Sequence, residues 1–259
     1  MSNTLQVALI QTHLVWENPI QNRQLLSKKI ETLPETIDII MLPEMFTTGF
    51  TMNAAQLAET MQGDTINWMQ TIAKQHQVAI TGSIIIKEHN NFYNRLLFVH
   101  PDGQIDSYDK RHAFTLAGED KVFTSGSKKI IIHYKGWKLC PMVCYDLRFP
   151  VWSRNVETYD VLLYVANWPN VRVQAWDTLL KARAIENMAY CVGVNRVGLD
   201  GNNHEYSGHS AVYDVLGNRI DHIPFDKEAM EIVTLHKSDI ETYREKLNFL
   251  GDMDGFTLR

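Results

Sequence analysis

The sequence predicts an α/β protein in which helices cover β-sheets. Short apolar runs rich in Val, Ile and Leu recur along the chain, and stretches with helical periodicity lie between them. Tight turns join some of these runs, so hairpins occur beside helical crossovers and a purely parallel doubly wound sheet fits poorly. No Ser/Gly/Pro-rich linker, low-complexity tract or internal repeat interrupts the chain. We therefore expect one domain over residues 1–259, with room for two sheets covered by helices.

The expected strands are the short apolar runs, several of which end at recognisable turns. The sequences PDG, DGN and LGN mark turns at residues 101–103, 200–202 and 216–218. A further short strand is expected just before Lys110. The expected strands are, in order, Leu5–Ile10, Ile37–Leu42, Val78–Ile86, Leu96–Val99, Ile130–Tyr134, Lys138–Val143, Val161–Val165, Cys191–Asn195, His209–Tyr213 and Glu231–Leu235.

Longer stretches between these runs have the spacing of helices. Around Phe149 and Pro150 the local rules are specific, because a residue before proline is extended and proline suits the first position of a helix. The expected helices are Pro19–Thr32, Asp64–His76, Val151–Thr158, Arg172–Met188 and Ser238–Lys246.

Composition and charge exclude several classes of protein. Hydrophobic residues make up 45% of the chain and charged residues 21%, which suits a compact protein with a sizeable core. The formal charge is −5 and there is no long basic run, which disfavours nucleic acid or an anionic membrane as the main partner. The first residues lack the pattern of a signal peptide, and no window of about 20 apolar residues could span a membrane. We expect a cytoplasmic protein.

The segment KLCPMVCYDLRFP, residues 138–150, contains two of the three cysteines, Cys140 and Cys144; the third is Cys191. A bridge between the first two is disfavoured, because four residues of extended strand separate Cα atoms by roughly 13 Å. A zinc site is also disfavoured, because the chain has neither a CxxC nor an HxxxH pair. Free thiols are expected, with Cys140 and Cys191 as packing residues.

Cys144 is expected where a buried strand meets a turn. Pro141 suggests an edge position or a local irregularity in that strand, and Asp146 could cap the following helical turn. Free N–H groups at such an elbow would stabilise a thiolate or an oxyanion. The segment alone leaves two interpretations open, a nucleophile or a small buried hydrophobic residue. A Cys–His pair with His112 or His209 is a further possibility.

Two other polar residues follow predicted strands. Glu44 ends the segment IDIIMLPE, just past its apolar run, where active-site residues of layered α/β proteins collect. Lys110 follows the strand expected in DSYDKRHAF. Each in isolation could be an ordinary surface residue. Together with Cys144 they could supply a general base, a cation and a nucleophile.

In this order the three segments resemble the nitrilase superfamily of carbon–nitrogen hydrolases. The resemblance maps a Glu–Lys–Cys triad onto Glu44, Lys110 and Cys144, which are 66 and 34 residues apart. Further matching motifs cover nearly the whole chain: GSIII, YNR, CYDLRFP, ANWP, KARAIEN, NRVG and YSGHSAVYDVLGN. Each motif is weak alone, but their joint order is specific.

The resemblance implies a four-layer α-β-β-α sandwich that forms homodimers, with Arg172–Met188 or the C-terminal segment at the interface. It implies hydrolysis of a C–N bond without a metal or an organic cofactor. Glu44 would be the general base and then the acid, and Cys144 would form a thioester. Lys110 and the backbone N–H of Tyr145 would stabilise the oxyanion. Glu119 would be a second glutamate that supports the lysine.

The motifs CYDLRFP, TLAGED and YREKLNFLGDMDGF resemble the bacterial omega-amidase branch specifically. Those enzymes hydrolyse the terminal amide of 2-oxoglutaramate or 2-oxosuccinamate. Arg148 is the candidate ligand for the substrate carboxylate, although an ion pair with the KARAIEN helix is an equal alternative. Arg183 and Glu186, at helical spacing, are expected to pair with each other. The pocket walls are expected to include Phe46, Tyr145 and Trp168.

Two alternatives stay open. Another amidase or an N-carbamoyl hydrolase would keep the triad and change the substrate. A non-catalytic relative would bind a metabolite or a protein on the same scaffold, although such a protein need not keep all three triad residues.

Overall fold

The structure, a computed structural model, describes residues 3–257 and contains two main sheets and a small hairpin. The six-stranded sheet has the order β13-β1-β2-β3-β4-β5, and the five-stranded sheet has the order β12-β9-β8-β7-β6. The first comprises β1 (Thr4–Gln11), β2 (Ile39–Met41), β3 (Ala79–Glu88), β4 (Asn91–Val99), β5 (Ile105–Asp109) and β13 (Ala229–His236). The second comprises β6 (Ile132–Tyr134), β7 (Trp137–Val143), β8 (Val161–Val165), β9 (Tyr190–Val194) and β12 (Ala211–Tyr213), while β10 (Val197–Leu199) and β11 (Glu205–Ser207) form the hairpin.

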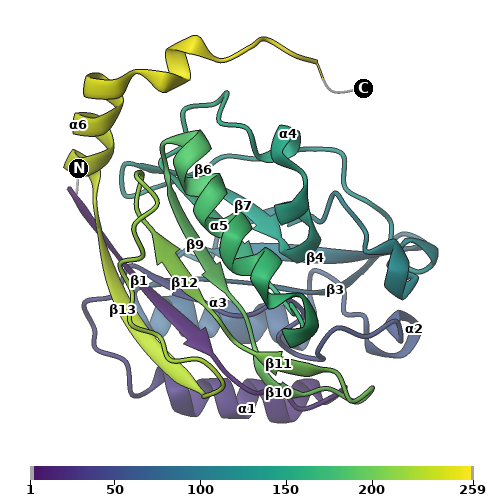
Figure 1. Cartoon of the computed structure of the whole chain (residues 1–259). Coiled ribbons are helices and arrows are strands. Elements are labelled where there is room, and N and C mark those ends of the chain that lie inside the picture. The colour runs from purple at the N-terminus through teal and green to yellow at the C-terminus, as the bar shows by residue number, and fades with distance from the viewer. Residues whose placement is uncertain (1–2, 258–259) are drawn as a thin grey trace.

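The six-stranded sheet is buried on both faces. Along β1, Val7 and Leu9 belong to the core shared with the second sheet, whereas Ala8 and Ile10 belong to a separate core beneath the helices. That second core includes apolar residues of α1 (Pro19–Ile30) and α3 (Asp64–His76), which lie together along the lower side of the molecule in Figure 1. The alternation of side chains along a strand therefore assigns one face to the helices and the other to the second sheet.

The outer face of the five-stranded sheet is covered by α5 (Val173–Asn187), which crosses in front of β9 and β12 in Figure 1. Trp176 and Leu180 of α5 are fully buried in the core that joins the two sheets. Gly193 of β9 permits this close approach, because a Cβ atom there would lie 2.6 Å from a methyl carbon of Leu180. The layers are thus helix, sheet, sheet and helix, which confirms the four-layer sandwich.

The remaining helical segments are short, except for α6. They are α2 (Ala54–Leu57), α4 (Pro150–Ser153), α6 (Lys237–Leu247), and the 3₁₀ turns η1 (Thr115–Ala117), η2 (Glu119–Lys121), η3 (Cys144–Arg148), η4 (Asn170–Arg172) and η5 (Phe249–Asp252). No helix among the described residues is long and apolar enough to cross a membrane.

The helix expected at Val151–Thr158 is wrong in its length. Pro150 begins α4 as expected, with Phe149 non-helical before it (φ −114°, ψ 86°), but the helix ends at Ser153. The buried side chain of Asn155 donates hydrogen bonds to the carbonyl oxygens of Tyr159 and Asn187, at 3.0 and 2.9 Å. These bonds hold an irregular connection to β8 in place of the rest of the expected helix.

Pro141 does not mark an edge strand, because β7 lies between β6 and β8. Pairing with β6 ends at Leu139, however, so only β8 pairs with β7 at Pro141. The missing N–H of proline is tolerated where one side of the strand has no partner. The hairpin of β10 and β11 had not been expected, because each of its strands is only three residues long.

Candidate active site

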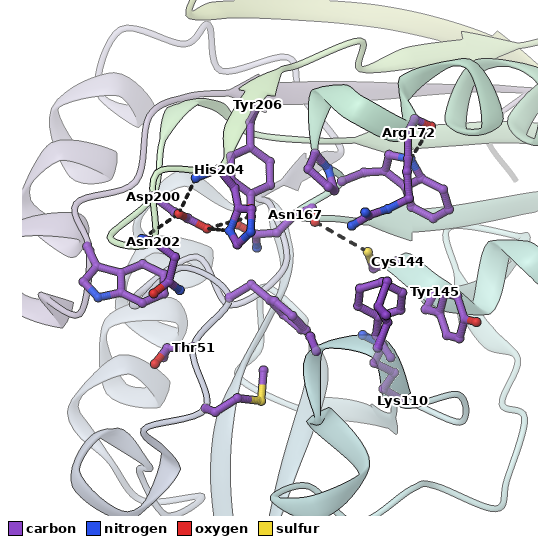
Figure 2. A pocket seen from close by; sticks show the side chains of 18 of the residues that line it. Thr51, Lys110, Cys144, Tyr145, Asn167, Arg172, Asp200, Asn202, His204 and Tyr206 are labelled. Atoms are coloured by element: carbon purple, nitrogen blue, oxygen red, sulfur yellow. Dashed lines mark hydrogen bonds and ion pairs between the residues drawn. The ribbon is translucent and has the colours of Figure 1, made fainter.

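A cavity of about 640 Å³ opens where several strands end, and Cys144 and Lys110 line it. Glu44 follows β2, Lys110 follows β5 and Cys144 follows β7. The β2 and β5 strands run in the same direction in one sheet, and β7 lies in the facing sheet. Figure 2 shows Lys110, Cys144 and Tyr145 together on one side of the pocket, with Asp200, Asn202 and His204 on the other. The sandwich therefore brings together three residues that are far apart in the chain.

Glu44 is fully buried beneath this cavity. Its Oε1 atom accepts hydrogen bonds from Lys110 Nζ at 2.9 Å and Asn94 Nδ2 at 2.8 Å. Its Oε2 atom accepts the backbone N–H of Asn167 at 2.8 Å. The carboxylate is thus oriented by three donors from three different segments.

Lys110 lies between two carboxylates. Its Nζ atom is 2.9 Å from Glu44 Oε1 and also donates to both carboxylate oxygens of Glu119, at 3.0 and 2.9 Å. Burial by itself would lower the pKa of Lys110. The negative charges of Glu119 and Glu44 have the larger combined effect, so the pKa lies above its ordinary value. Lys110 therefore stays an ammonium ion. Glu119 is fully buried and bonds to Lys110, the residue that the resemblance led us to expect it to support.

Cys144 is the first residue of η3 and has a φ of +44°. A left-handed conformation is uncommon for a residue with a side chain, and it turns the chain sharply at the end of β7. Cys144 keeps 8% of its surface exposed, whereas Cys140 and Cys191 keep none, so only this cysteine reaches the cavity. Its Sγ atom lies 3.9 Å from the carbonyl oxygen of Asn167.

The Cys144 thiol is surrounded by opposing charges. Burial raises its pKa well above the ordinary value, and the nearby Glu44 carboxylate raises it further. The positive charge of Lys110 lowers the pKa of the Cys144 thiol. The resting group is therefore a thiol beside a carboxylate that can accept its proton, rather than a preformed thiolate.

Asn94 and Asn167 are site residues that the sequence reasoning missed. Asn94 donates through Nδ2 to Glu44 and also to Glu119 Oε1, at 3.2 Å. Asn167 contacts both Glu44 and Cys144 through its backbone. Each lies inside a motif that carried the family resemblance, YNR or ANWP, and that position was the available signal.

Asp146, expected to cap a following helical turn, lies within the turn η3 and its side chain holds the start of that same turn. Its Oδ2 atom accepts the N–H of Val143 at 3.0 Å and the hydroxyl of Tyr108 at 2.7 Å. Its Oδ1 atom accepts the backbone N–H of His112 at 3.0 Å and lies 2.7 Å from His112 Nδ1. This buried carboxylate thus fixes the Cys144 elbow to the segment that contains Lys110.

The expected substrate-binding residues lie in two different places. Arg148, Tyr145 and Trp168 line the cavity, as expected of pocket residues. Phe46 does not, because it is fully buried in the core beneath α3, with its ring 5.8 Å from that of Trp68. The expectation for Phe46 is wrong, because Met45 has a φ of +42° and turns the chain away from the cavity immediately after Glu44.

Arg148 does not form the ion pair with the KARAIEN helix that was the alternative for it; Arg183 forms an ion pair there instead. Arg183 Nη1 is 2.9 Å from Glu186 Oε1, which confirms the expected pair within α5. Arg183 Nη2 also donates to the carbonyl oxygen of Leu147, at 2.6 Å, and so fastens α5 to the elbow. Among the described residues Arg148 has no ion-pair partner, and its guanidinium lies 5.0 Å from the ring centroid of Trp168.

Neither histidine considered as a base for Cys144 lies in the cavity lining. His112 contacts Asp146 and stacks on Phe149, with ring centroids 3.7 Å apart. His209 pairs with Asp177 at 2.9 Å and stacks on Phe225. Glu44, and neither imidazole, is the group that interacts with the Cys144 thiol.

Comparison with known proteins identifies the family. The sequence profile of the carbon–nitrogen hydrolases matches residues 6–245. The chain belongs to the carbon–nitrogen hydrolase family, and its fold and buried Glu–Lys–Cys cluster agree with the resemblance found in its sequence.

Two proteins of similar sequence and one solved structure are similar to this chain over most of its length. The chain is 43% identical to omega-amidase YafV of Yersinia enterocolitica over 258 residues, which cover 99% of each chain. It is 33% identical to 2-oxoglutaramate amidase of Bacillus subtilis (strain 168), over 82% of this chain and 83% of that one. The fold is also similar to the crystal structure of XC1258 from Xanthomonas campestris, a CN-hydrolase superfamily protein with an arsenic adduct in its active site. The alignment covers 100% of each chain, with a TM-score of 0.97 and 40% identity.

Proposed function

We propose that this protein is an omega-amidase, which hydrolyses the terminal amide of 2-oxoglutaramate or 2-oxosuccinamate to the 2-oxo acid and ammonia. The observation that carries the proposal is the arrangement of Cys144, Glu44 and Lys110 beside one cavity. The full-length similarity to an omega-amidase and the similarity to a 2-oxoglutaramate amidase support this choice of substrate.

In the first half of the reaction, Glu44 accepts the thiol proton of Cys144 as Sγ attacks the amide carbon. The carbonyl oxygen becomes an oxyanion, which Lys110 and the backbone N–H of Tyr145 stabilise. When the C–N bond breaks, protonated Glu44 gives its proton to the leaving amine. Ammonia departs, and the acyl group remains on Cys144 as a thioester.

In the second half, water replaces ammonia. Glu44 accepts a proton from the water as its oxygen attacks the thioester carbon, and the same oxyanion site is used again. The C–S bond then breaks, the acid leaves, and the proton on Glu44 returns to the sulfur of Cys144. One carboxylate thus acts as base and acid in both halves. Its burial and its three hydrogen-bond donors hold it in one orientation throughout.

Glu119 has a supporting role in this scheme. It bonds to Lys110 through both oxygens, and the backbone N–H of Phe114 also donates to it. Burial raises the pKa of Glu119, while the charge of Lys110 lowers it. Glu119 holds the ammonium ion beside Glu44 and does not contact the reacting carbon.

The decisive experiment compares ammonia release from 2-oxoglutaramate, from simple neutral amides and from nitriles. A clearly higher kcat/KM for 2-oxoglutaramate is expected, and equal rates would reject the substrate assignment. N-carbamoyl substrates would release carbon dioxide as well as ammonia, so a carbon dioxide assay identifies that alternative. Turnover that disappears in Cys144→Ala would reject a purely binding role for the protein.

We place the protein in the cytoplasm as a homodimer. The three cysteines are unpaired and buried, which suits a reducing compartment. Val171 and Ile185, before and within α5, are 83% and 45% exposed and would be covered if that helix lies at the dimer interface. Light scattering on the purified protein measures the mass directly, and a monomeric mass would contradict the dimer.

A further inference from the structure

Six charged or titratable side chains line the cavity, and three of them lie in ion pairs. They are Glu17, Lys110, Arg148, Arg172, Asp200 and His204. The ammonium group of Lys110 bonds to Glu44 and Glu119, and His204 pairs with Asp200 at 3.1 Å. Within residues 3–257, the guanidinium groups of Arg148 and Arg172 have no hydrogen-bond acceptor and no ion-pair partner. These two arginines are therefore the cations available to an anionic ligand.

Both guanidinium groups are held by aromatic rings rather than by acids. Arg148 lies 5.0 Å from the ring centroid of Trp168, and Arg172 lies 5.0 Å from that of Phe114. The indole Nε1–H of Trp168 donates to the backbone oxygen of Arg172 at 2.8 Å, which connects the two pairs. Contact with a ring orients a guanidinium group while leaving its N–H donors free to bind a carboxylate.

Phe114 also connects this arginine pair to the catalytic cluster. Its backbone N–H donates to Glu119 Oε2 at 2.5 Å, and the same oxygen accepts from Lys110 Nζ. The ring that contacts Arg172 is thus fixed relative to the ammonium group beside Cys144. In Figure 2 the side chain of Arg172 extends into the pocket on the side of Asn167 and Cys144. A ligand bound by Arg172 would therefore have its other end near the sulfur.

We propose that Arg172 is a specificity-determining residue, which together with Arg148 binds the carboxylate of the substrate and selects amides of small dicarboxylic acids. This inference rests on the proposed omega-amidase function and extends it to a residue that the sequence did not indicate. A planar carboxylate matches the paired N–H donors of a guanidinium group, whereas a neutral amide with a methyl terminus leaves them unsatisfied. Selection for the anion follows from that difference.

The kinetic test uses Arg172→Gln and Arg172→Lys with two substrates, 2-oxoglutaramate and the neutral amide pentanamide. Loss of a charge-assisted contact is expected to lower kcat/KM for 2-oxoglutaramate roughly 10- to 100-fold in Arg172→Gln, mainly through KM. Arg172→Lys keeps the charge but loses the paired donors, so only partial recovery is expected. The kcat/KM for pentanamide should not change. Lys74→Gln, which removes an exposed positive charge on α3 outside the cavity lining, is the matched control and should behave as the parent protein.

A binding measurement separates failure of this inference from failure of the proposed function. Calorimetry is performed with the product 2-oxoglutarate on Cys144→Ala and on Cys144→Ala/Arg172→Gln, neither of which can turn over substrate. Weaker binding by the double variant supports the role of Arg172 even if the parent enzyme proves to prefer another amide. Equal binding by both, or a parent-like preference for 2-oxoglutaramate in Arg172→Gln, overturns it while leaving the omega-amidase function intact.

Discussion

The backbone N–H of Asn167 lies 2.8 Å from Glu44 Oε2, and Asn167 belongs to the segment that follows β8 in the opposite sheet. The carbonyl oxygen of the same asparagine is 3.9 Å from the sulfur of Cys144. One residue just beyond the second sheet thus contacts both the proposed base, which follows a strand of the first sheet, and the proposed nucleophile. The relative positions of Glu44 and Cys144 therefore depend on how the two sheets pack.

Glu44→Gln should remove the general base and leave the fold intact. An amide oxygen can still accept the N–H of Asn167, but it cannot take the thiol proton. We expect kcat to fall by about 10²- to 10⁴-fold, the usual contribution of a positioned acid or base. Steady-state ammonia release measures this, and the surface variant Glu35→Gln is the control. Activity near that of the parent enzyme would exclude Glu44 as the base.

Lys110→Met should destabilise the protein as well as inactivate it. The substitution leaves Glu44 and Glu119 buried without their cation, which is expected to lower the free energy of unfolding by about 3–5 kcal/mol. Urea denaturation measures the loss. Lys110→Met/Glu119→Gln should recover part of this stability but no turnover, because one buried charge is removed and the oxyanion partner is still missing. If the single variant proved as stable as the parent, the charge cluster would not contribute to stability.

The titration of Cys144 should respond in opposite directions to its two charged neighbours. Burial and the Glu44 carboxylate raise the pKa of the thiol, and Lys110 lowers it. Glu44→Gln should therefore lower that pKa and increase the thiolate fraction at a fixed pH, whereas Lys110→Met should reduce it. Ultraviolet thiolate absorbance against pH reports the change, with each matching Cys144→Ala variant as background. Shifts in the same direction for both variants would contradict this electrostatic account.

Asp146→Asn should loosen the elbow. The carboxylate accepts hydrogen bonds from Val143, Tyr108 and His112, and an amide oxygen cannot replace both of its oxygens as acceptors. We expect the free energy of unfolding to fall by about 1.5–3 kcal/mol, the range for hydrogen bonds to charged groups. Thermal and urea unfolding check this against Asp254→Asn, a change at an exposed position. A reduced kcat is also expected, because Cys144 depends on this support for its φ of +44°.

The order of most elements could be predicted from local patterns in the sequence, whereas Glu44, Lys110 and Cys144 were selected by the joint order of motifs that resembles a family. Apolar runs mark strands because a buried strand requires apolar side chains, whatever its neighbours are. Glu44, Lys110 and Cys144 each follow such a run, so their sequence positions already place them at strand ends. Arg183 and Glu186 were predictable for a similar reason, because helical spacing alone brings them together.

Only the tertiary structure decided which residues near the triad face the cavity and which belong to the core. Phe46 is two positions from Glu44, yet its ring packs under Gly82, where a Cβ atom would lie 2.7 Å from it. Arg172 faces the cavity although a helix start gives no sign of that. The reason is physical: a single left-handed residue such as Met45 reverses the direction of the next side chain. The partners of a buried polar group such as Asn94, likewise, come from segments that meet only when the sheets pack.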